Sequence, residues 1–141
     1  MKKLVLLFAA LFLITSCSMD DNTPTFHVEF IPVESVEVPD YFAAGNTYQI
    51  KVRYKRPTDC HFYDGFYYEE SGGALIVAVQ TLVIEDAKCE PLENMQPEES
   101  IFEFTCSPMT ADVSAYLFKF YKGEDDAGNP IYMDIEVPVA Q

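Results

Sequence analysis

Cys17 is the residue with the plainest chemical context, because its thiol closes a short N-terminal apolar stretch. Lys2 and Lys3 give the chain a basic start, and Leu4 to Ile14 is an unbroken apolar run. A charged start followed by a short apolar run is typical of a secretory signal, and this run is too short for a comfortable membrane span. We therefore expect an exported chain with a thiol at the end of its signal.

The residues around Cys17 resemble a known processing signal. Ile14-Thr15-Ser16-Cys17 places small residues before the cysteine, as in the lipobox of bacterial lipoproteins. In that family the thiol is acylated, the chain is cut before the cysteine, and the new amine receives lipid. The resemblance implies a signal peptide at 1–16 and lipidation of Cys17. An ordinary signal peptide is the alternative, although such peptides usually end in an Ala-x-Ala type site.

Residues 17–25 are expected to form the acylated cysteine and a flexible tether. Ser18-Met19-Asp20-Asp21-Asn22 resembles the acidic surface-export signal of Bacteroidota lipoproteins. The resemblance implies a lipid-anchored protein of the cell envelope, held in the outer membrane and exposed at the surface. A solvated polar tether would use the same residue types, and in that case the domain would face the periplasm.

Composition limits the classes of partner. Removing residues 1–16 from the 141 leaves 125, which is the length of one ordinary domain. The cut also removes two lysines, so 7 basic residues face 23 acidic ones and the net charge is about −16. Nucleic acid would repel such a chain, which excludes it as a partner. Val, Ile, Leu, Phe and Tyr recur throughout and can form a core.

The residue pattern predicts the fold class. Period-two alternation of apolar and polar residues, typical of strands, occurs at 26–30, 36–38, 48–54, 62–70, 102–106, 116–120 and 131–137. Residues 74–84 are almost continuously apolar, and Gly72-Gly73 before them predicts a hairpin turn. The alternation at 48–54 gives that strand a basic outer face. We predict an all-β domain at 26–141, an Ig-like antiparallel β-sandwich of seven to eight strands.

Residues 112–118 favour the Ig-like form of this fold. Asp112-Val113-Ser114-Ala115-Tyr116-Leu117-Phe118 resembles the Asp-x-Gly-x-Tyr-x-Cys segment of immunoglobulin domains. The resemblance implies that Tyr116 begins the penultimate strand and that its hydroxyl bonds back to the preceding loop. Ser114 replaces the glycine and Phe118 replaces the cysteine, so the inter-sheet disulfide of antibodies is not implied.

Three cysteines remain once Cys17 carries lipid. An odd number in an exported protein favours one disulfide and one free thiol. Folding about the Gly72 turn brings residue 60 opposite 84 or 85, so we predict a Cys60–Cys89 disulfide, with Cys89–Cys106 as the alternative. Cys106 is expected to be a small buried residue. The cysteine spacings match no zinc pattern, so we assign no metal site.

Catalytic chemistry is sparse in this sequence. His27 and His61 are the two histidines, and alternation places them opposite Phe26 and Phe62, which predicts exposed imidazoles. Serine nucleophile elbows, glycine-rich phosphate loops and metalloprotease motifs are absent. Residues 124–129 faintly resemble a calcium loop, but the glutamate that ends such a loop is missing, and we expect a plain hairpin turn. We assign no catalytic residue and no cofactor, and we do not expect an enzyme.

The aromatic segment 62–68 is the best candidate for a binding surface. Strict alternation would place Phe62, Phe66 and Tyr68 on one face and Tyr63 and Tyr67 on the other. The second face would then present a tyrosine pair beside His61, and tyrosine is favoured at interfaces. Cross-strand packing of the aromatic rings explains the same pattern and is the interpretation that we favour. The chain has no tryptophan, which counts against sugar binding.

These features predict a lipid-anchored cell-envelope protein that acts as a non-catalytic binding or accessory module, and it looks like the small surface lipoproteins of Bacteroidota. Its partners would be the membrane, through the lipid, and a protein or glycan of unknown identity. An inhibitor or stabilising subunit of a larger envelope assembly is the first alternative, and an enzyme is the second. A binding module should expose an apolar patch of more than a few hundred Å², whereas an enzyme should have a cleft that gathers titratable groups.

Overall fold

The computed structural model describes residues 24–92, 94–108 and 113–140, and in these ranges the chain forms strands. The strands are β1 (Phe26–Ile31), β2 (Val33–Glu37), β3 (Phe42–Ala43), β4 (Thr47–Tyr54), β5 (His61–Ser71), β6 (Ala74–Ile84), β7 (Glu98–Thr105), β8 (Ala115–Glu124) and β9 (Pro130–Ala140). The predicted signal peptide and Cys17 lie outside the described residues. Within the described ranges, no helix has the length and apolar character needed to cross a membrane.

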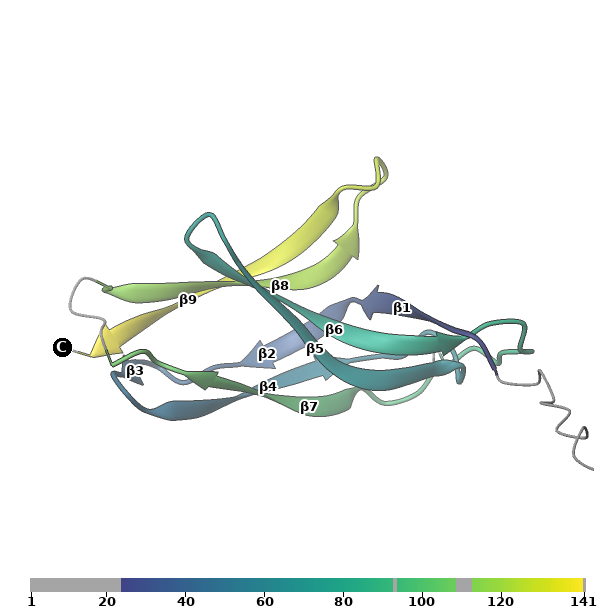
Figure 1. Ribbon diagram of the computed structural model, residues 1–141, viewed down its shortest axis with the longest axis horizontal. Helices are drawn as coiled ribbons and strands as arrows, with labels where there is room; N and C mark the ends of the chain where they lie inside the picture. Colours follow the sequence, from purple (N-terminus) through teal and green to yellow (C-terminus); the bar gives the residue numbers. More distant parts are fainter. Residues whose placement is uncertain (1–23, 93, 109–112, 141) are drawn as a thin grey trace, which may run out of the picture.

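The strands form two sheets that pack face to face, so the prediction of an all-β fold is confirmed (Figure 1). The larger sheet has six strands in the order β1-β6-β8-β9-β3, with β5 paired to the other edge of β6. The smaller sheet has three strands in the order β2-β4-β7. The described residues hold nine strands rather than seven or eight, partly because β3 has two residues and is too short to show a period.

β6 is the central strand of the larger sheet, as its apolar sequence suggests. One edge pairs with β5 along almost its whole length. The other edge is shared, because Ala74–Val77 pairs with β8 and Val79–Ile84 pairs with β1. β1 and β8 therefore lie one after the other along β6, and the end of β8 has to diverge to leave room for β1.

Consecutive strands β1 and β2 belong to different sheets, with Pro32 between them. Proline lacks a backbone N–H and cannot continue a ladder. Most strand pairs are antiparallel, as predicted, but β6–β8 and β3–β9 are parallel. Immunoglobulin sheets consist of antiparallel strands, so these two pairs are a departure from that pattern.

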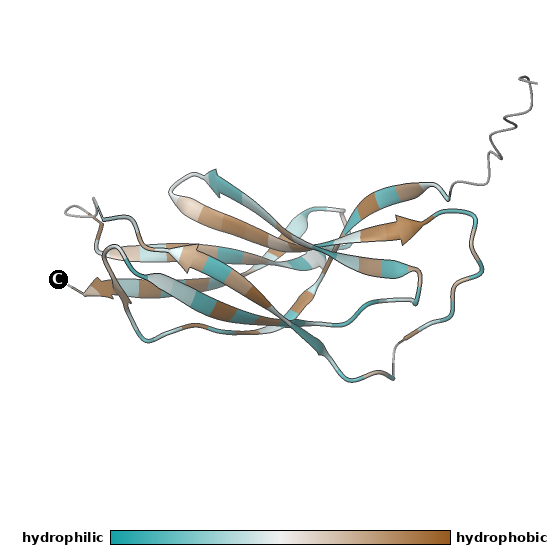
Figure 2. Ribbon diagram, turned by 60° about the horizontal axis from the view of Figure 1, so that its bottom comes forward, coloured by the Kyte–Doolittle hydropathy of each residue, from teal (hydrophilic) through white to brown (hydrophobic). Residues whose placement is uncertain are grey.

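The core lies between the two sheets and follows the predicted alternation, which Figure 2 shows along the strands. In β4, Ile50 and Val52 are fully buried, whereas Arg53 points outward. The basic outer face predicted for β4 is neutralised by acids, since Arg53 Nη2 lies 2.7 Å from a Glu37 carboxylate oxygen and 2.8 Å from one of Glu99. This ion pair joins all three strands of the smaller sheet.

Two predicted turns and the free thiol are also found. Gly72 and Gly73 join β5 to β6 with φ values of 59° and 80°, as a tight hairpin of positive φ requires. Between β8 and β9, the Asp125 Oδ1 atom accepts backbone hydrogen bonds from residues 127 and 129 at 2.9 and 2.8 Å. Cys106 is free and fully buried beside the core strand β7, in agreement with its predicted role.

Tyr116 occupies the position that the immunoglobulin resemblance implies, near the start of β8. Its ring packs edge-on against Phe42 and Phe104, with centroid distances of 5.9 and 4.9 Å. Burial raises the pKa of the Tyr116 hydroxyl, and a hydrogen bond with the backbone of Ser107 acts in the opposite direction. The hydroxyl therefore bonds back to the segment that precedes β8.

Candidate binding surface

A β-bulge in β5 decides which aromatic side chains reach the surface. Tyr63 lies opposite Thr81, and Gly65 lies opposite the adjacent residue Gln80, so Asp64 is the extra residue. Gly65 has a φ of 110°, a conformation that L side chains rarely adopt. Strict alternation therefore fails at this point. Residues before the bulge and residues after it do not share the faces that the sequence pattern predicted for them.

The expected surface of His61, Tyr63 and Tyr67 does not form. His61 is 6% exposed and lies on the inner side of the larger sheet. The Tyr63 ring also faces inward and stacks on Tyr54, with centroids 5.7 Å apart. Tyr67 lies on the opposite, outer face, where its ring contacts Phe30 at 5.0 Å. The bulge separates the two tyrosines, because it reverses the alternation between them.

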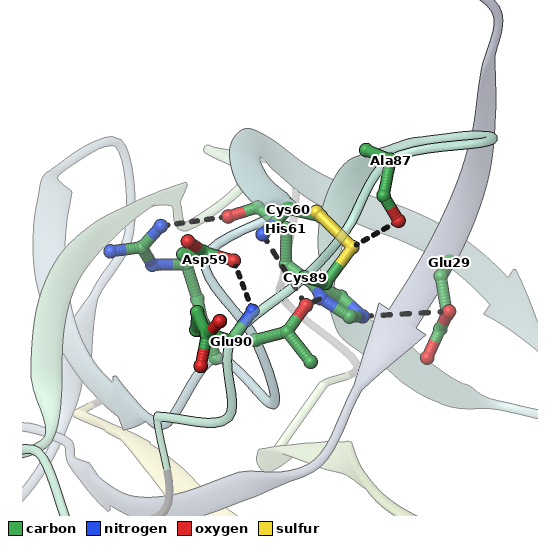
Figure 3. The surroundings of a disulfide bond; sticks show 9 residues. Glu29, Asp59, Cys60, His61, Ala87, Cys89 and Glu90 are labelled. Carbon is green, nitrogen blue, oxygen red and sulfur yellow. Dashed lines mark hydrogen bonds and ion pairs between the residues drawn. A yellow bond between two sulfur atoms is a disulfide. The ribbon is translucent and has the colours of Figure 1, made fainter.

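Contacts with neighbouring side chains fix the position of His61 at the start of β5 (Figure 3). Its Nδ1 atom lies 2.8 Å from Thr58 Oγ1, and its carbonyl oxygen accepts a 2.8 Å hydrogen bond from Arg56 Nη1. The buried Nε2 atom points toward Glu29, 3.6 Å from a carboxylate oxygen. The prediction of an exposed imidazole is therefore wrong for His61, whereas His27 is exposed and lies 3.4 Å from a Glu85 carboxylate oxygen.

The Cys60–Cys89 disulfide is present, as predicted, beside His61 (Figure 3). It ties the loop after β6 to the start of β5. Asp59 strengthens the same junction, since its Oδ1 atom accepts a 2.8 Å hydrogen bond from the Glu90 amide. Among the residues that the structure describes, Asp59, Cys60 and Cys89 are the group close enough to share a metal ion. Their two sulfurs are bonded to each other, so this junction is structural.

A set of apolar side chains covers the outer face of the larger sheet around β1, the end of β6 and the start of β5. We call it the apolar face, and it consists of Phe26, Val28, Phe30, Phe62, Leu82 and Ile84. Val28, Leu82 and Phe62 form one row across three strands, because Leu82 lies opposite both of the others. Val28 is 53% exposed and Phe62 is 46% exposed. The outer side of the larger sheet, which faces away from the smaller sheet, is therefore apolar in this region.

The apolar face has polar boundaries. Asp64 lies at one margin, where its Oδ2 atom accepts a 2.8 Å hydrogen bond from Gln80. Farther along the same outer face, Lys119 and Asp134 form an ion pair at 2.7 Å between β8 and β9. A shallow groove runs along the β1 edge where β8 diverges, and its lining includes Tyr121. The apolar side chains therefore form one bounded region at one end of the sheet.

The apolar face is suited to contact with a partner and not to catalysis. Its six members carry no ionisable group, so they can neither transfer a proton nor bind a metal. Contiguous exposed apolar patches on folded domains mark sites of protein or membrane interaction. Comparison of the chain with protein-family models, with curated proteins and with solved structures finds no match.

Proposed function

We propose that this chain is a lipid-anchored, non-catalytic binding or accessory module of the cell envelope, and that the apolar face is its contact surface. The row formed by Val28, Leu82 and Phe62 carries the proposal. These side chains lie on the outer side of a sheet whose inner side already forms the core, so the smaller sheet does not cover them, and Val28 and Phe62 remain about half exposed. Burial against a partner would remove this apolar area from water.

The sequence around Cys17 supports the envelope location. A lipid on Cys17 would confine the domain to a membrane surface, and the partner would then be a component of that envelope. The same face would serve the alternative role of a stabilising or inhibitory subunit, because an apolar sheet face suits a permanent protein interface. Both roles require that the face be covered in the cell.

The domain that presents this face is, in our proposal, a variant of the Ig-like sandwich. Tyr116 supports this, because it lies at the start of the penultimate strand and its hydroxyl bonds back to the backbone of the preceding segment, at Ser107. Tyr116→Phe removes only the hydroxyl and should lower the free energy of unfolding. Unchanged stability in Tyr116→Phe would contradict this role of the hydroxyl.

Cross-linking in cells tests the proposed contact. A photo-reactive amino acid at position 62 should join the protein to an envelope component. The same amino acid at Ile101 is the matched control, since Ile101 is 39% exposed on the outer face of the smaller sheet. A cross-link from position 62 and none from 101 supports the proposal. Equal yields at the two positions, or none at 62, would contradict it.

The anchor needs its own measurement. Mass spectrometry of the mature N-terminus should find an acylated, lipid-capped Cys17, and Cys17→Ser should release the chain from membranes or leave it unprocessed. A free amine and free thiol at Cys17 would contradict the anchor. That result would leave the cross-linking test of the apolar face independent of it.

A further inference from the structure

We infer that the occupant of the apolar face is the bilayer that carries the lipid anchor, so that the domain has a second contact with the membrane. The inference rests on the proposed function for the anchor at Cys17. It adds a statement about orientation: the domain would lie with the β1 end of the larger sheet against the headgroup boundary, with the outer face of the smaller sheet turned away.

The length of the tether is the first support. Eight residues separate Cys17 from Phe26, the first residue of both β1 and the apolar face. Even a fully extended chain of this length spans only about 30 Å. Phe26 cannot move farther than that from a lipid-modified Cys17. The described chain therefore enters the fold at the same end of the sheet that is apolar (Figure 1).

The side chains themselves fit the headgroup boundary. Phenylalanine and valine gain from leaving water, and the exposed members of the face are Phe26, Phe30, Phe62 and Val28. The Phe30 ring is flanked by the rings of Tyr67 and Tyr121, with centroids 5.0 and 6.4 Å away. Tyrosine combines an apolar ring with a polar tip and is enriched at membrane–water interfaces.

The distribution of charge argues against other arrangements. A second copy of the chain would bring two strongly acidic molecules together, because the mature net charge is about −16 and like charges repel. The outer face of the smaller sheet is a poor membrane surface, since it carries the ion pairs of Arg53 with Glu37 and Glu99. The apolar face can approach zwitterionic headgroups without burying a charge of its own.

A cysteine that carries lipid on both its thiol and its amine would already hold the chain stably on a membrane. The apolar face would add orientation, because it would fix which side of the domain lies against the bilayer. An oriented domain presents the same loops outward in every copy. Figure 1 shows the tip of the β5–β6 hairpin on the far side of the fold from the start of β1, and the tip of the β8–β9 hairpin projecting from the fold.

Tryptophan fluorescence can test the contact, because the chain contains no tryptophan. The mature chain from Cys17 onward is coupled through the Cys17 thiol to maleimide lipid in phosphatidylcholine vesicles. Cys106 is fully buried and Cys60 and Cys89 are joined, so coupling is confined to Cys17. Chemical coupling imposes the anchor, so the result does not depend on whether cells acylate the protein.

Phe62→Trp and, as a second reporter, Val28→Trp are compared with Ile101→Trp. With lipids brominated near the headgroup, emission from the first two should fall at least twofold on vesicle coupling, while Ile101→Trp stays unchanged. Circular dichroism identical to that of the parent chain confirms that each variant is folded. Unquenched emission from both reporters would overturn the inference, and equal quenching of all three would do so too. Neither result would touch the proposed function, because a protein partner would still cross-link from position 62.

Discussion

Val28 and Phe62 lie on opposite sides of Leu82 in one row across three strands, and about half of each side chain is exposed. They belong to strands that are distant in sequence and come together only through β6. The row is built by the fold, yet it contributes little to the core. It is therefore the part of the molecule where a change should affect contact with a partner far more than stability.

Val28→Thr and Phe62→Thr should each lower the free energy of unfolding by less than about 1 kcal/mol, because both side chains are largely outside the core and threonine suits a strand. Urea unfolding of residues 18–141 measures this. Phe118→Ala is the buried control, since Phe118 is 0% exposed, and it should cost about 3 to 5 kcal/mol. A similar loss in all three variants would mean that the apolar face is packed within the single chain.

Loss of the disulfide should be costly. Cys60 and Cys89 are separated by 29 residues, and the chain-entropy estimate for a loop of that length is about 3 to 4 kcal/mol. Cys60→Ser and Cys89→Ser should lower the melting temperature to the same degree, and the double variant should be no less stable than either. Cys106→Ser should cost much less. Peptide mapping without reductant checks the pairing, and a Cys89–Cys106 peptide would refute it.

The Arg53 ion pairs should stabilise the smaller sheet only above acid pH. Hydrogen bonding and charge attraction from Arg53 lower the pKa of Glu37 below its ordinary value of 4.5. A folded-state pKa below the unfolded one gives stability that is present above the unfolded value and lost as pH falls through the folded value. Arg53→Gln should therefore be less stable than the parent chain at pH 7.

The difference between Arg53→Gln and the parent chain should shrink as the pH falls from 4.5 through the lower pKa that Glu37 has in the folded parent chain, because Glu37 is then protonated with or without Arg53. Urea midpoints at pH 7 and pH 3 give this comparison. A high-salt series at pH 7 should reduce the same difference, since both groups are exposed to solvent. A difference that is equal at both pH values would show that Arg53 acts through packing alone.

Gly65→Ala tests the bulge that places Phe62 on the surface. Nothing lies within 4 Å of the position a Cβ would take, so the cost comes from the backbone, whose φ is 110°. We expect a loss of about 1 to 3 kcal/mol in the free energy of unfolding. Gly72→Asn, in a hairpin turn that accepts asparagine, should cost less. If Gly65→Ala were neutral, the bulge would not require glycine.

The sequence patterns were sufficient for the strands with a regular period. The apolar run of β6 and the alternation in β4 predict the bounds of these strands to within one residue, whereas β9 extends three residues beyond its predicted end at 137. The Gly72-Gly73 turn predicts the Cys60–Cys89 pairing. The exposed faces were harder to predict. Alternation shows that a strand has an apolar face without showing whether the second sheet reaches it, and at β1 it does not.

The prediction of the binding surface was wrong for a related reason. His61 was expected on the surface because Phe62 is apolar, but the two exchange roles: His61 is buried, and Phe62 is on the outer face. One extra residue at Asp64 then reverses the alternation that follows. A bulge of this kind is set by its partner strand. The Asp64-Gly65 pair was the local signal that could have suggested it.

Thiol labelling in native envelopes tests most directly whether the apolar face is covered. Val28→Cys and Ile101→Cys start with comparable exposure, at 53% and 39% for the parent side chains. A membrane-impermeant maleimide should label both at similar rates in purified residues 18–141. In intact envelope fragments, our account predicts that Val28→Cys is labelled several-fold more slowly than Ile101→Cys. Equal labelling rates in the envelope would contradict the proposal that this face is the contact surface.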